Sequence, residues 1–251
     1  MTEPDPAPRL SVVFPCLDEA DRLPGTLATY LAHYPPDQTG VEVVVVDDGS
    51  TDATAAVAEA IAATDPRVRV LRTARNRGKG HAVRAGIRAA LGELLVFTDA
   101  DGSYGPEEVD RVVAALDEAP VAIGARHRTQ AGAGPFPRRL AGWVFNLAMR
   151  RLLPLDFHDT QCGLKGFRRE AATAIFGRAR VDGYAFDVEA LLLARRLGLK
   201  VVEVPVRLSR RDGSRVRFVA DALRMLADVW AVRRAAARGA YDEAPVRDPA
   251  G

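Results

Sequence analysis

The chain has 251 residues, of which 48% are hydrophobic and 27% charged, and these proportions are typical of one globular domain with a full apolar core. Its net charge of +2 is too small to indicate nucleic-acid binding, and its two cysteines are too few for a disulfide scaffold and are not spaced as a zinc site. No apolar stretch approaches the roughly 20 residues that span a bilayer, and the N-terminal sequence lacks a signal-peptide pattern, so we expect a cytoplasmic protein.

Apolar strands alternate with helical segments along the chain. The runs that predict strands are residues 10–14, 41–46, 68–71, 94–98, 121–124 and 201–208. The first should stop at Pro15, and the helix after the third strand should start near Ala82. This order predicts an α/β fold, with a mostly parallel central sheet, helices on both faces and functional loops along one edge.

Acidic residues follow three of these strands directly. Glu19 lies in CLDEADR after the first strand, Asp47 and Asp48 end the second, and Asp99 and Asp101 follow the fourth in VFTDADGSY. Open α/β sheets bind ligands at such strand ends. The two carboxylates of the D-x-D offer hard oxygen ligands to Mg²⁺ or Mn²⁺ shared with a diphosphate. Ordinary turns and helix capping are the alternative interpretations.

Basic loops could bind the anion that such a metal accompanies. Lys79 lies in RTARNRGKGH, where backbone amides and the next helix N-terminus favour phosphate, and a solvated basic loop is the alternative. It is not a P-loop, because neither Ser nor Thr follows Gly78-Lys79. Arg126 and Arg138 lie in a second such loop, and Arg215 lies in a third.

Further charged residues cluster in the second half. Asp159 and Lys165 lie in HDTQCGLKGFRREAA, a polar loop that should become a short strand and helix. Asp187 and Glu189 begin an apolar helix, where complementarity to the helix dipole is the alternative explanation.

Two apolar segments that carry tryptophan are expected to be helical. One contains Trp143 between pairs of arginines, and the other is an amphipathic C-terminal helix within residues 210–238. Basic residues beside such stretches favour the lipid headgroup boundary, while packing in the core or in a homodimer is the alternative. Residues 1–8 and 239–251 are predicted to be flexible tails around a main domain of residues 9–209.

Several motifs occur together in an order typical of one enzyme family. P-x-x-D-E, VDDGSTD, NRGKG and FTDADGSY resemble the inverting family-two glycosyltransferases. DTQCGLKGF, YAFDVE and the distal GSR look like those of dolichyl-phosphate β-glucosyltransferases and related polyprenyl-phosphate glycosyltransferases, and the resemblance spans about residues 10–230. It implies a GT-A type fold, Mg²⁺ or Mn²⁺, a nucleotide-sugar donor and a polyprenyl-phosphate acceptor, hence peripheral attachment to the inner face of a membrane.

The resemblance also assigns residues. It assigns Pro15, Leu17, Glu19, Asp48, Asp99 and Asp101 to the nucleotide sugar, and we expect Asp47, Lys79 and Ala100 to bind it as well. Asp99 and Asp101 would hold the metal. The sequence departs from the family at Leu17 and Asp18, where Tyr-Asn is common.

A phosphomonoester is already mostly anionic at neutral pH, so the acceptor needs no strong general base. The side chains expected to hold its phosphate are Arg126, Arg138, Lys165 and Arg215. Asp159 and Asp187 are candidates for contacting the sugar or orienting the acceptor. UDP-glucose is the expected donor.

Four alternatives remain open from the sequence. They are a GDP-mannose-dependent mannosyltransferase, transfer to a soluble acceptor, a nucleotidyltransferase and a non-catalytic nucleotide-binding module. A nucleotidyltransferase is expected to have a Gly-rich phosphate-binding loop directly after the first strand, where this chain has CLDEADR.

Overall fold

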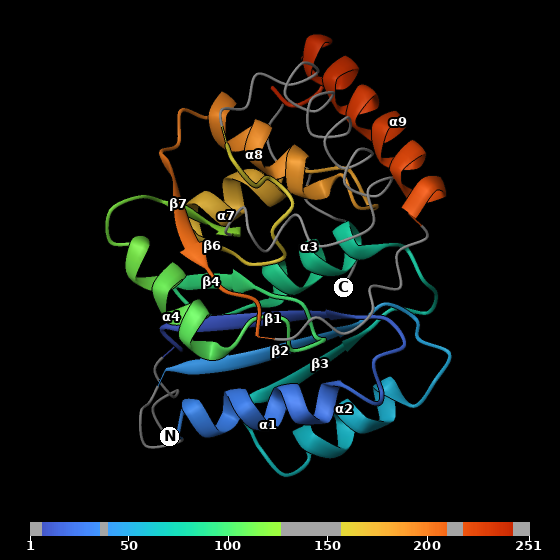
Figure 1. Cartoon of the computed structure of the whole chain (residues 1–251), viewed down its shortest axis with the longest axis vertical. Coiled ribbons are helices and arrows are strands. Elements are labelled where there is room, and N and C mark those ends of the chain that lie inside the picture. Colours follow the sequence, from blue (N-terminus) through green and yellow to red (C-terminus); the bar gives the residue numbers. More distant parts are fainter. Residues whose placement is uncertain (1–6, 36–39, 127–156, 210–217, 243–251) are drawn as a thin grey trace, which may run out of the picture.

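The computed structural model describes residues 7–35, 40–126, 157–209 and 218–242, and within them a seven-stranded sheet forms the centre of the molecule (Figure 1). The strands are β1 (Leu10–Cys16), β2 (Val41–Asp47), β3 (Val68–Arg72), β4 (Leu94–Phe97), β5 (Val121–Arg126), β6 (Lys165–Arg168) and β7 (Val201–Val206). Their spatial order is β3-β2-β1-β4-β6-β5-β7.

All strand pairs are parallel except those of β6, which runs antiparallel to both β4 and β5. The mostly parallel sheet predicted from the sequence is therefore confirmed. The order reverses at β1, because β2 and β3 lie on one side of it and β4 on the other. Loops that leave the carboxyl ends of β1, β2 and β4 meet at this reversal, which is where open α/β sheets bind ligands.

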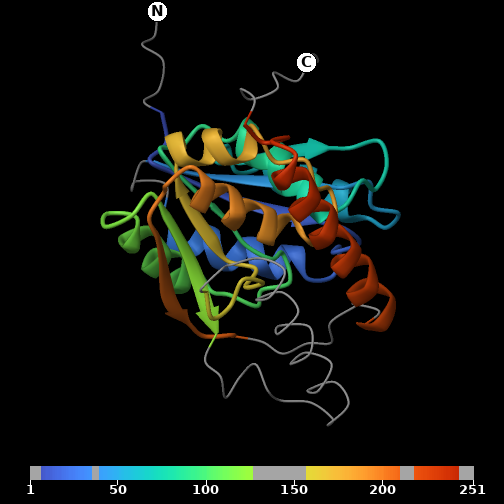
Figure 2. The same cartoon turned by 90° about the horizontal axis from the view of Figure 1, so that it is seen from above.

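Helices cover both faces of the sheet (Figures 1 and 2). They are α1 (Leu23–His33), α2 (Thr54–Ala62), α3 (Lys79–Ala89), α4 (Pro106–Ala115), α7 (Arg169–Phe176), α8 (Phe186–Arg196) and α9 (Phe218–Ala237). Apolar side chains of α1, α2 and α4 pack on one face, and those of α3, α7 and α8 pack on the other. None of the helices in the described part of the chain is long and apolar enough to cross a membrane.

Burial on both faces explains the composition of β2. Val44 and Val46 point into one hydrophobic core, whereas Val43 and Val45 point into the other, and all four are at most 1% exposed. A strand that is buried on both faces typically has a continuous run of β-branched residues, as β2 has. Each such side chain contributes roughly 1.5 kcal/mol or more by leaving water. The strand ends that carry the acidic residues are thus fixed from inside the core.

Several element boundaries differ from those predicted, and two of these differences concern the segments that lead to the site. β1 continues through Pro15, which lies opposite Val46, to Cys16. The carbonyl of Val13 faces β4, where it accepts a hydrogen bond from Thr98, and by alternation Pro15 faces the same side. Pairing with β4 ends at Val13, so the missing N–H of proline removes no ladder bond.

The second difference is that α3 begins at Lys79 instead of Ala82. Gly78 precedes it with a φ of 114°, so the Gly-Lys-Gly sequence forms the helix start and not a loop. Lys79 is thereby placed in the first helical turn.

The C-terminal part of the described chain packs against α8 (Figure 2). Val229 and Val232 of α9 are buried, whereas Trp230 is 54% exposed. Tyr241 is 4% exposed and belongs to the core, although the sequence predicts a flexible tail from residue 239. The amphipathic character predicted for the whole helix stays a prediction, and the Trp143 segment lies outside the described residues.

Candidate active site

The D-x-D residues follow a strand that is anchored in the core. Thr98 is buried directly after β4, and the carbonyl of Ala100, itself buried, accepts a hydrogen bond of 2.9 Å from Thr26 Oγ1. Asp101 Oδ1 accepts a hydrogen bond of 2.9 Å from the Ser103 amide, which closes a turn that stabilises the loop. Asp99 and Asp101 are both partly exposed. A fixed backbone therefore presents two partly exposed carboxylates, one residue apart in the sequence.

Asp99 is paired with the lysine at the start of α3. Lys79 Nζ lies 2.5 Å from Asp99 Oδ1. Burial alone would lower the pKa of Lys79, but the carboxylates of Asp99 and Asp187 raise it well above its usual value, so the ammonium group stays charged. A Cβ atom at Gly163 would overlap the Asp99 carboxylate, which explains why glycine stands in the neighbouring loop. Asp99 is therefore already paired with one cationic group, the ammonium of Lys79.

Asp99 and Asp101 could hold a divalent metal ion. Within the described residues no group of three or more His, Cys, Asp or Glu side chains is arranged to hold a metal. Two carboxylates are instead what Mg²⁺ and Mn²⁺ use when phosphates and water supply the remaining ligands. The residues present fit an ion that the protein and a diphosphate bind jointly.

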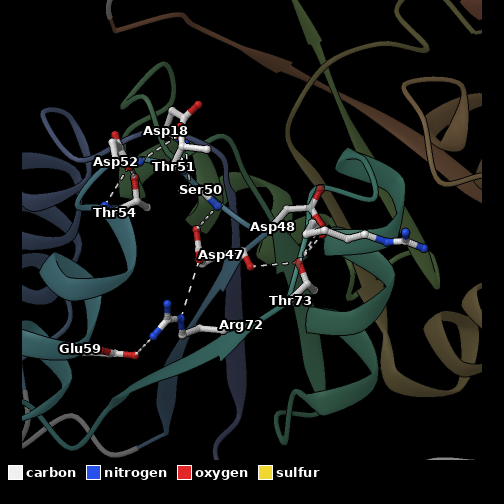
Figure 3. A network of polar contacts seen from close by, with 11 residues as sticks. Asp18, Asp47, Asp48, Ser50, Thr51, Asp52, Thr54, Glu59, Arg72 and Thr73 are labelled. Atoms are coloured by element: carbon white, nitrogen blue, oxygen red, sulfur yellow. Dashed lines mark hydrogen bonds and ion pairs between the residues drawn. The ribbon is translucent and has the colours of Figure 1, made fainter.

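Asp48 organises the loop that leads to α3 (Figure 3). Its carboxylate accepts hydrogen bonds from the Gly78 amide at 2.7 Å, the Arg77 amide at 3.1 Å and Thr73 Oγ1 at 3.1 Å. His81 Nδ1 lies 3.6 Å away, and burial, assisted by Arg77, lowers the pKa of that imidazole. Asp48 thus fixes the NRGKG segment. Contact with a nucleotide stays a prediction for this side chain.

Asp47 fits the turn interpretation more closely. It is buried at the end of β2, where its Oδ1 accepts a 3.2 Å hydrogen bond from the Ser50 amide. Its Oδ2 lies 4.0 Å from Arg72 Nε, and Arg72 also pairs with Glu59 at 3.1 Å (Figure 3). These contacts stabilise the DDGSTD turn.

The loops after β1 and β2 are joined by side chains (Figure 3). Asp18, with a φ of 55°, accepts a 2.8 Å hydrogen bond from the Thr51 amide, and its own amide donates to Ser50 Oγ at 2.9 Å. The Glu19 amide donates to Thr54 Oγ1 at 2.7 Å, and Glu19 pairs with Arg22 at 2.5 Å. The sequence did not reveal this role of Asp18. One feature of the sequence could have indicated it: Asp18 stands where the family often has asparagine, and both residue types adopt positive φ more readily than most.

Three other predicted nucleotide-pocket residues lie nearby in the chain. Pro15 is half-buried in β1, Leu17 is 39% exposed just beyond it, and Ala100 is buried between the two D-x-D carboxylates in sequence. Their contacts with a nucleotide stay predictions.

Two residues predicted to bind the acceptor phosphate form ion pairs with the two predicted sugar-site carboxylates. The guanidinium of Arg126 donates to both oxygens of Asp159, at 2.6 and 2.9 Å. Burial would raise the pKa of Asp159, but Arg126 holds it below its usual range. Lys165 Nζ donates to Asp187 Oδ1 and to the Cys162 carbonyl, each at 2.7 Å.

Lys165 and Asp187 lie inside the protein. Lys165 is 0% exposed and Asp187 6%. Burial raises the pKa of Asp187, and Lys165 and Lys79 partly oppose that shift. Lys165 is therefore enclosed, and its geometry favours holding Asp187 over direct contact with an acceptor. Arg138 and Arg215 lie outside the described residues.

The structure thus brings together acids from the ends of β2 and β4 and from α8 with bases from α3 and β6 at one edge of the sheet. The model for "Glycosyl transferase family 2" matches residues 11–176, which contain every one of these except Asp187. The chain belongs to glycosyl transferase family 2. It is a glycosyltransferase with a GT-A type fold, as the sequence motifs predict.

Family members of known activity are similar over most of the chain. A dolichyl-phosphate beta-glucosyltransferase from Drosophila melanogaster is 37% identical over 247 residues, which cover 92% of this chain and 76% of that protein. An undecaprenyl-phosphate mannosyltransferase from Micrococcus luteus is 34% identical over 211 residues, covering 81% of this chain and 85% of the relative.

Solved structures share the fold at lower identity. Glucosyl-3-phosphoglycerate synthase from Mycobacterium tuberculosis, in complex with Mn²⁺, UDP-glucose and phosphoglyceric acid, has a TM-score of 0.67 and 21% identity, covering 90% of this chain and 80% of that chain. Its complex with phosphoglyceric acid alone has a TM-score of 0.70 and 22% identity, with the same coverage.

Proposed function

We propose that the protein transfers glucose from UDP-glucose to a polyprenyl or dolichyl phosphate, with inversion at the anomeric carbon. The observation that carries this proposal is the pair of partly exposed carboxylates, Asp99 and Asp101, presented by β4 beside the cationic start of α3. The dolichyl-phosphate glucosyltransferase relatives support both the donor sugar and the lipid acceptor.

The protein's main task is to bring two anions together. Mg²⁺ or Mn²⁺ held by Asp99 and Asp101 would neutralise charge on the leaving diphosphate. Lys79, which already lies 2.5 Å from Asp99, is suited to contact the same diphosphate. The acceptor phosphate is an adequate nucleophile at neutral pH, so its position decides the rate.

Arg126 is suited to hold that acceptor phosphate from the end of β5. Its side chain is 31% exposed, whereas Lys165 is enclosed. Because Asp159 holds the guanidinium through two hydrogen bonds, the side chain is pre-organised for an anion. Arg138 and Arg215 are proposed as further phosphate ligands.

Two finer alternatives have specific support. The Micrococcus luteus relative is a mannosyltransferase, which favours mannose as the transferred sugar, and the structural similarity to glucosyl-3-phosphoglycerate synthase favours a soluble phosphorylated acceptor. Isothermal titration with UDP-glucose and with GDP-mannose, each with Mg²⁺, distinguishes the donors. Tighter binding of GDP-mannose would reverse the choice of sugar.

The acceptor is tested by turnover. The protein is supplied with the preferred donor and either a polyprenyl phosphate in detergent or phosphoglycerate. Product formed on the lipid alone supports the proposal, whereas product on phosphoglycerate alone would replace the lipid with a soluble acceptor. Donor binding without turnover on either would favour a non-catalytic module.

Transfer to a lipid requires the site to approach a bilayer surface. We propose peripheral attachment at the inner face of a membrane, in part through α9, where Trp230 is 54% exposed and the Arg234 guanidinium lies 5.2 Å from the centre of its ring. An aromatic side chain beside basic residues suits the headgroup region of an anionic bilayer. Homodimer formation through the same surface is the alternative.

A further inference from the structure

A buried carboxylate of α8 anchors a short segment of backbone on the same side of the sheet as α3. Glu189 is 0% exposed, although it lies in the first turn of α8. Its carboxylate accepts hydrogen bonds from the amides of Arg180 and Val181, at 2.9 Å each. A buried carboxylate with several amide donors is held firmly, because losing any of them leaves polar groups unsatisfied. Glu189 therefore fixes residues 180 and 181.

The anchored segment continues directly to the start of α3. The Asp182 carbonyl accepts hydrogen bonds from the amides of Gly80 at 2.7 Å and His81 at 3.2 Å. These are first-turn N–H groups of a helix, which have no partner within the helix itself. The Asp182 carboxylate is also bonded to Arg84, one turn further along α3. Residue 182 thus caps α3 from outside the helix.

The glycines of the NRGKG motif are explained by this contact. A Cβ atom on Gly80 would lie 2.5 Å from the Val181 carbonyl oxygen and 2.6 Å from Phe186 Cβ. A Cβ on Gly78 would overlap the Asp182 carbonyl. The two backbones therefore approach closely on both sides of Lys79, and any displacement of residues 180–183 is transmitted to that lysine.

The C-terminal residues close this arrangement from the other side. Tyr241 is 4% exposed, and its hydroxyl donates a 2.7 Å hydrogen bond to Glu189 Oε1. The Arg180 guanidinium lies 5.9 Å from the centre of the Tyr241 ring. The phenol thus supplies the third donor to the carboxylate and packs over the anchored segment.

We propose that Glu189 and Tyr241 are positioning residues for the active site. Through residues 180–183 they set the first turn of α3, and with it the position of Lys79 relative to Asp99. The claim concerns the geometry of α3, and only its effect on donor binding rests on the proposed function.

The test compares Tyr241→Phe and Glu189→Gln with a matched control. Tyr241→Phe removes one hydrogen bond and keeps the ring, so it folds even if Glu189→Gln does not. Glu42→Gln is the control, because Glu42 is also a buried carboxylate, 5% exposed, that accepts bonds from Ser11 Oγ and the Leu91 amide. It lies at the opposite end of β2 from the acidic turn.

Hydrogen–deuterium exchange of a peptide covering residues 77–83 reports on α3 without any substrate. Losing one net hydrogen bond predicts that Tyr241→Phe speeds exchange at Gly80 and His81 by about threefold to tenfold. The Glu42→Gln control should speed exchange around Leu91 and leave that peptide unchanged. Unchanged exchange at residues 77–83 in Tyr241→Phe, or an equal change in the control, would overturn the proposal.

The second arm measures affinity for UDP-glucose with Mn²⁺ below the melting temperature of every variant. If Glu189 and Tyr241 only stabilised the fold, their substitution would lower the melting temperature and leave the affinity unchanged, as expected for Glu42→Gln. Positioning predicts an additional loss of affinity in Tyr241→Phe, of about threefold or more. Faster exchange at residues 77–83 with unchanged affinity would overturn the link to the site, whereas a wild type that binds no donor would refute the proposed function and leave the exchange result to decide the geometry.

Discussion

Replacing Lys165 with methionine tests the most deeply buried ion pair of the site. Lys165 Nζ is enclosed and lies 2.7 Å from Asp187 Oδ1, so the substitution keeps the length of the side chain and removes its charge. Asp187 would then be a buried carboxylate without that partner. Removing one member of a buried ion pair typically costs about 3–5 kcal/mol, because the remaining charge is left uncompensated.

Thermal unfolding measures this loss of stability. For a chain of this size about 1 kcal/mol corresponds to roughly 2–4 °C, so Lys165→Met should lower the melting temperature by about 6–20 °C at pH 7. Lys200→Met is the matched control, since Lys200 is exposed and its Nζ donates a 3.2 Å hydrogen bond to the Glu118 carbonyl. It should change stability by no more than about 0.5 kcal/mol.

The pH dependence follows from the pKa of Asp187, which burial raises. A carboxyl group with a raised folded-state pKa favours the folded state below its unfolded pKa, and this contribution is lost as the pH rises through the folded value. Removing Lys165 raises that pKa further. The stability gap between Lys165→Met and wild type should therefore narrow as the pH falls from 7 towards about 4.

A double variant gives the strictest check. Adding Asp187→Leu to Lys165→Met removes the orphaned carboxylate, and most of the lost stability should return. The account of this pair is refuted if Lys165→Met is as stable as wild type at pH 7, or if acid widens the gap.

Further predictions concern α3 and the membrane. Gly80→Ala should destabilise the protein by about 1–3 kcal/mol in urea unfolding, because its Cβ would meet Val181 and Phe186. Gly25→Ala should be neutral or stabilising, because Gly25 is an exposed position of α1 where a Cβ would have nothing within 4 Å. Equal effects would contradict the packing described here. Wild-type protein should sediment with anionic liposomes at low salt and less so at high salt, and Trp230→Ala should weaken this, while Leu91→Ala, with the same 54% exposure, should not. Protein that stays in the supernatant at low salt would exclude α9 as a docking surface.

The parts of the site that the sequence predicts are those encoded within a few residues. The run of β-branched residues before Asp47 and Asp48, and the apolar residues before Asp99 and Asp101, identify strand ends directly, and parallel strands bring such ends to one edge. The family motifs occur at the same places, so fold and enzyme class followed from local patterns.

The pairings between these groups were not predictable in the same way. Arg126 and Asp159 are 33 positions apart, and Tyr241 and Glu189 are 52 apart. No spacing rule links such positions, and each charge alone fits a solvated loop or a helix dipole equally well. Lys165 illustrates the consequence, because a lysine in a polar loop suggests a phosphate ligand, whereas the fold encloses it next to Asp187.

The start of α3 shows the opposite case, in which a local rule gave the wrong boundary. Two glycines around Lys79 normally indicate a loop, since glycine disfavours helix interiors. Here residues 180–183 approach so closely that Gly80 has no room for a side chain, and this contact determines where the helix begins.

The central claim is tested most directly by lipid glycosylation with and without metal. Wild-type protein, UDP-glucose and polyprenyl phosphate should yield a β-linked glucosyl lipid with Mg²⁺ or Mn²⁺. Excess EDTA, or Asp99→Asn with the wild-type circular dichroism spectrum, should abolish most of this product. Full turnover in excess EDTA, or undiminished turnover by Asp99→Asn, would contradict the account.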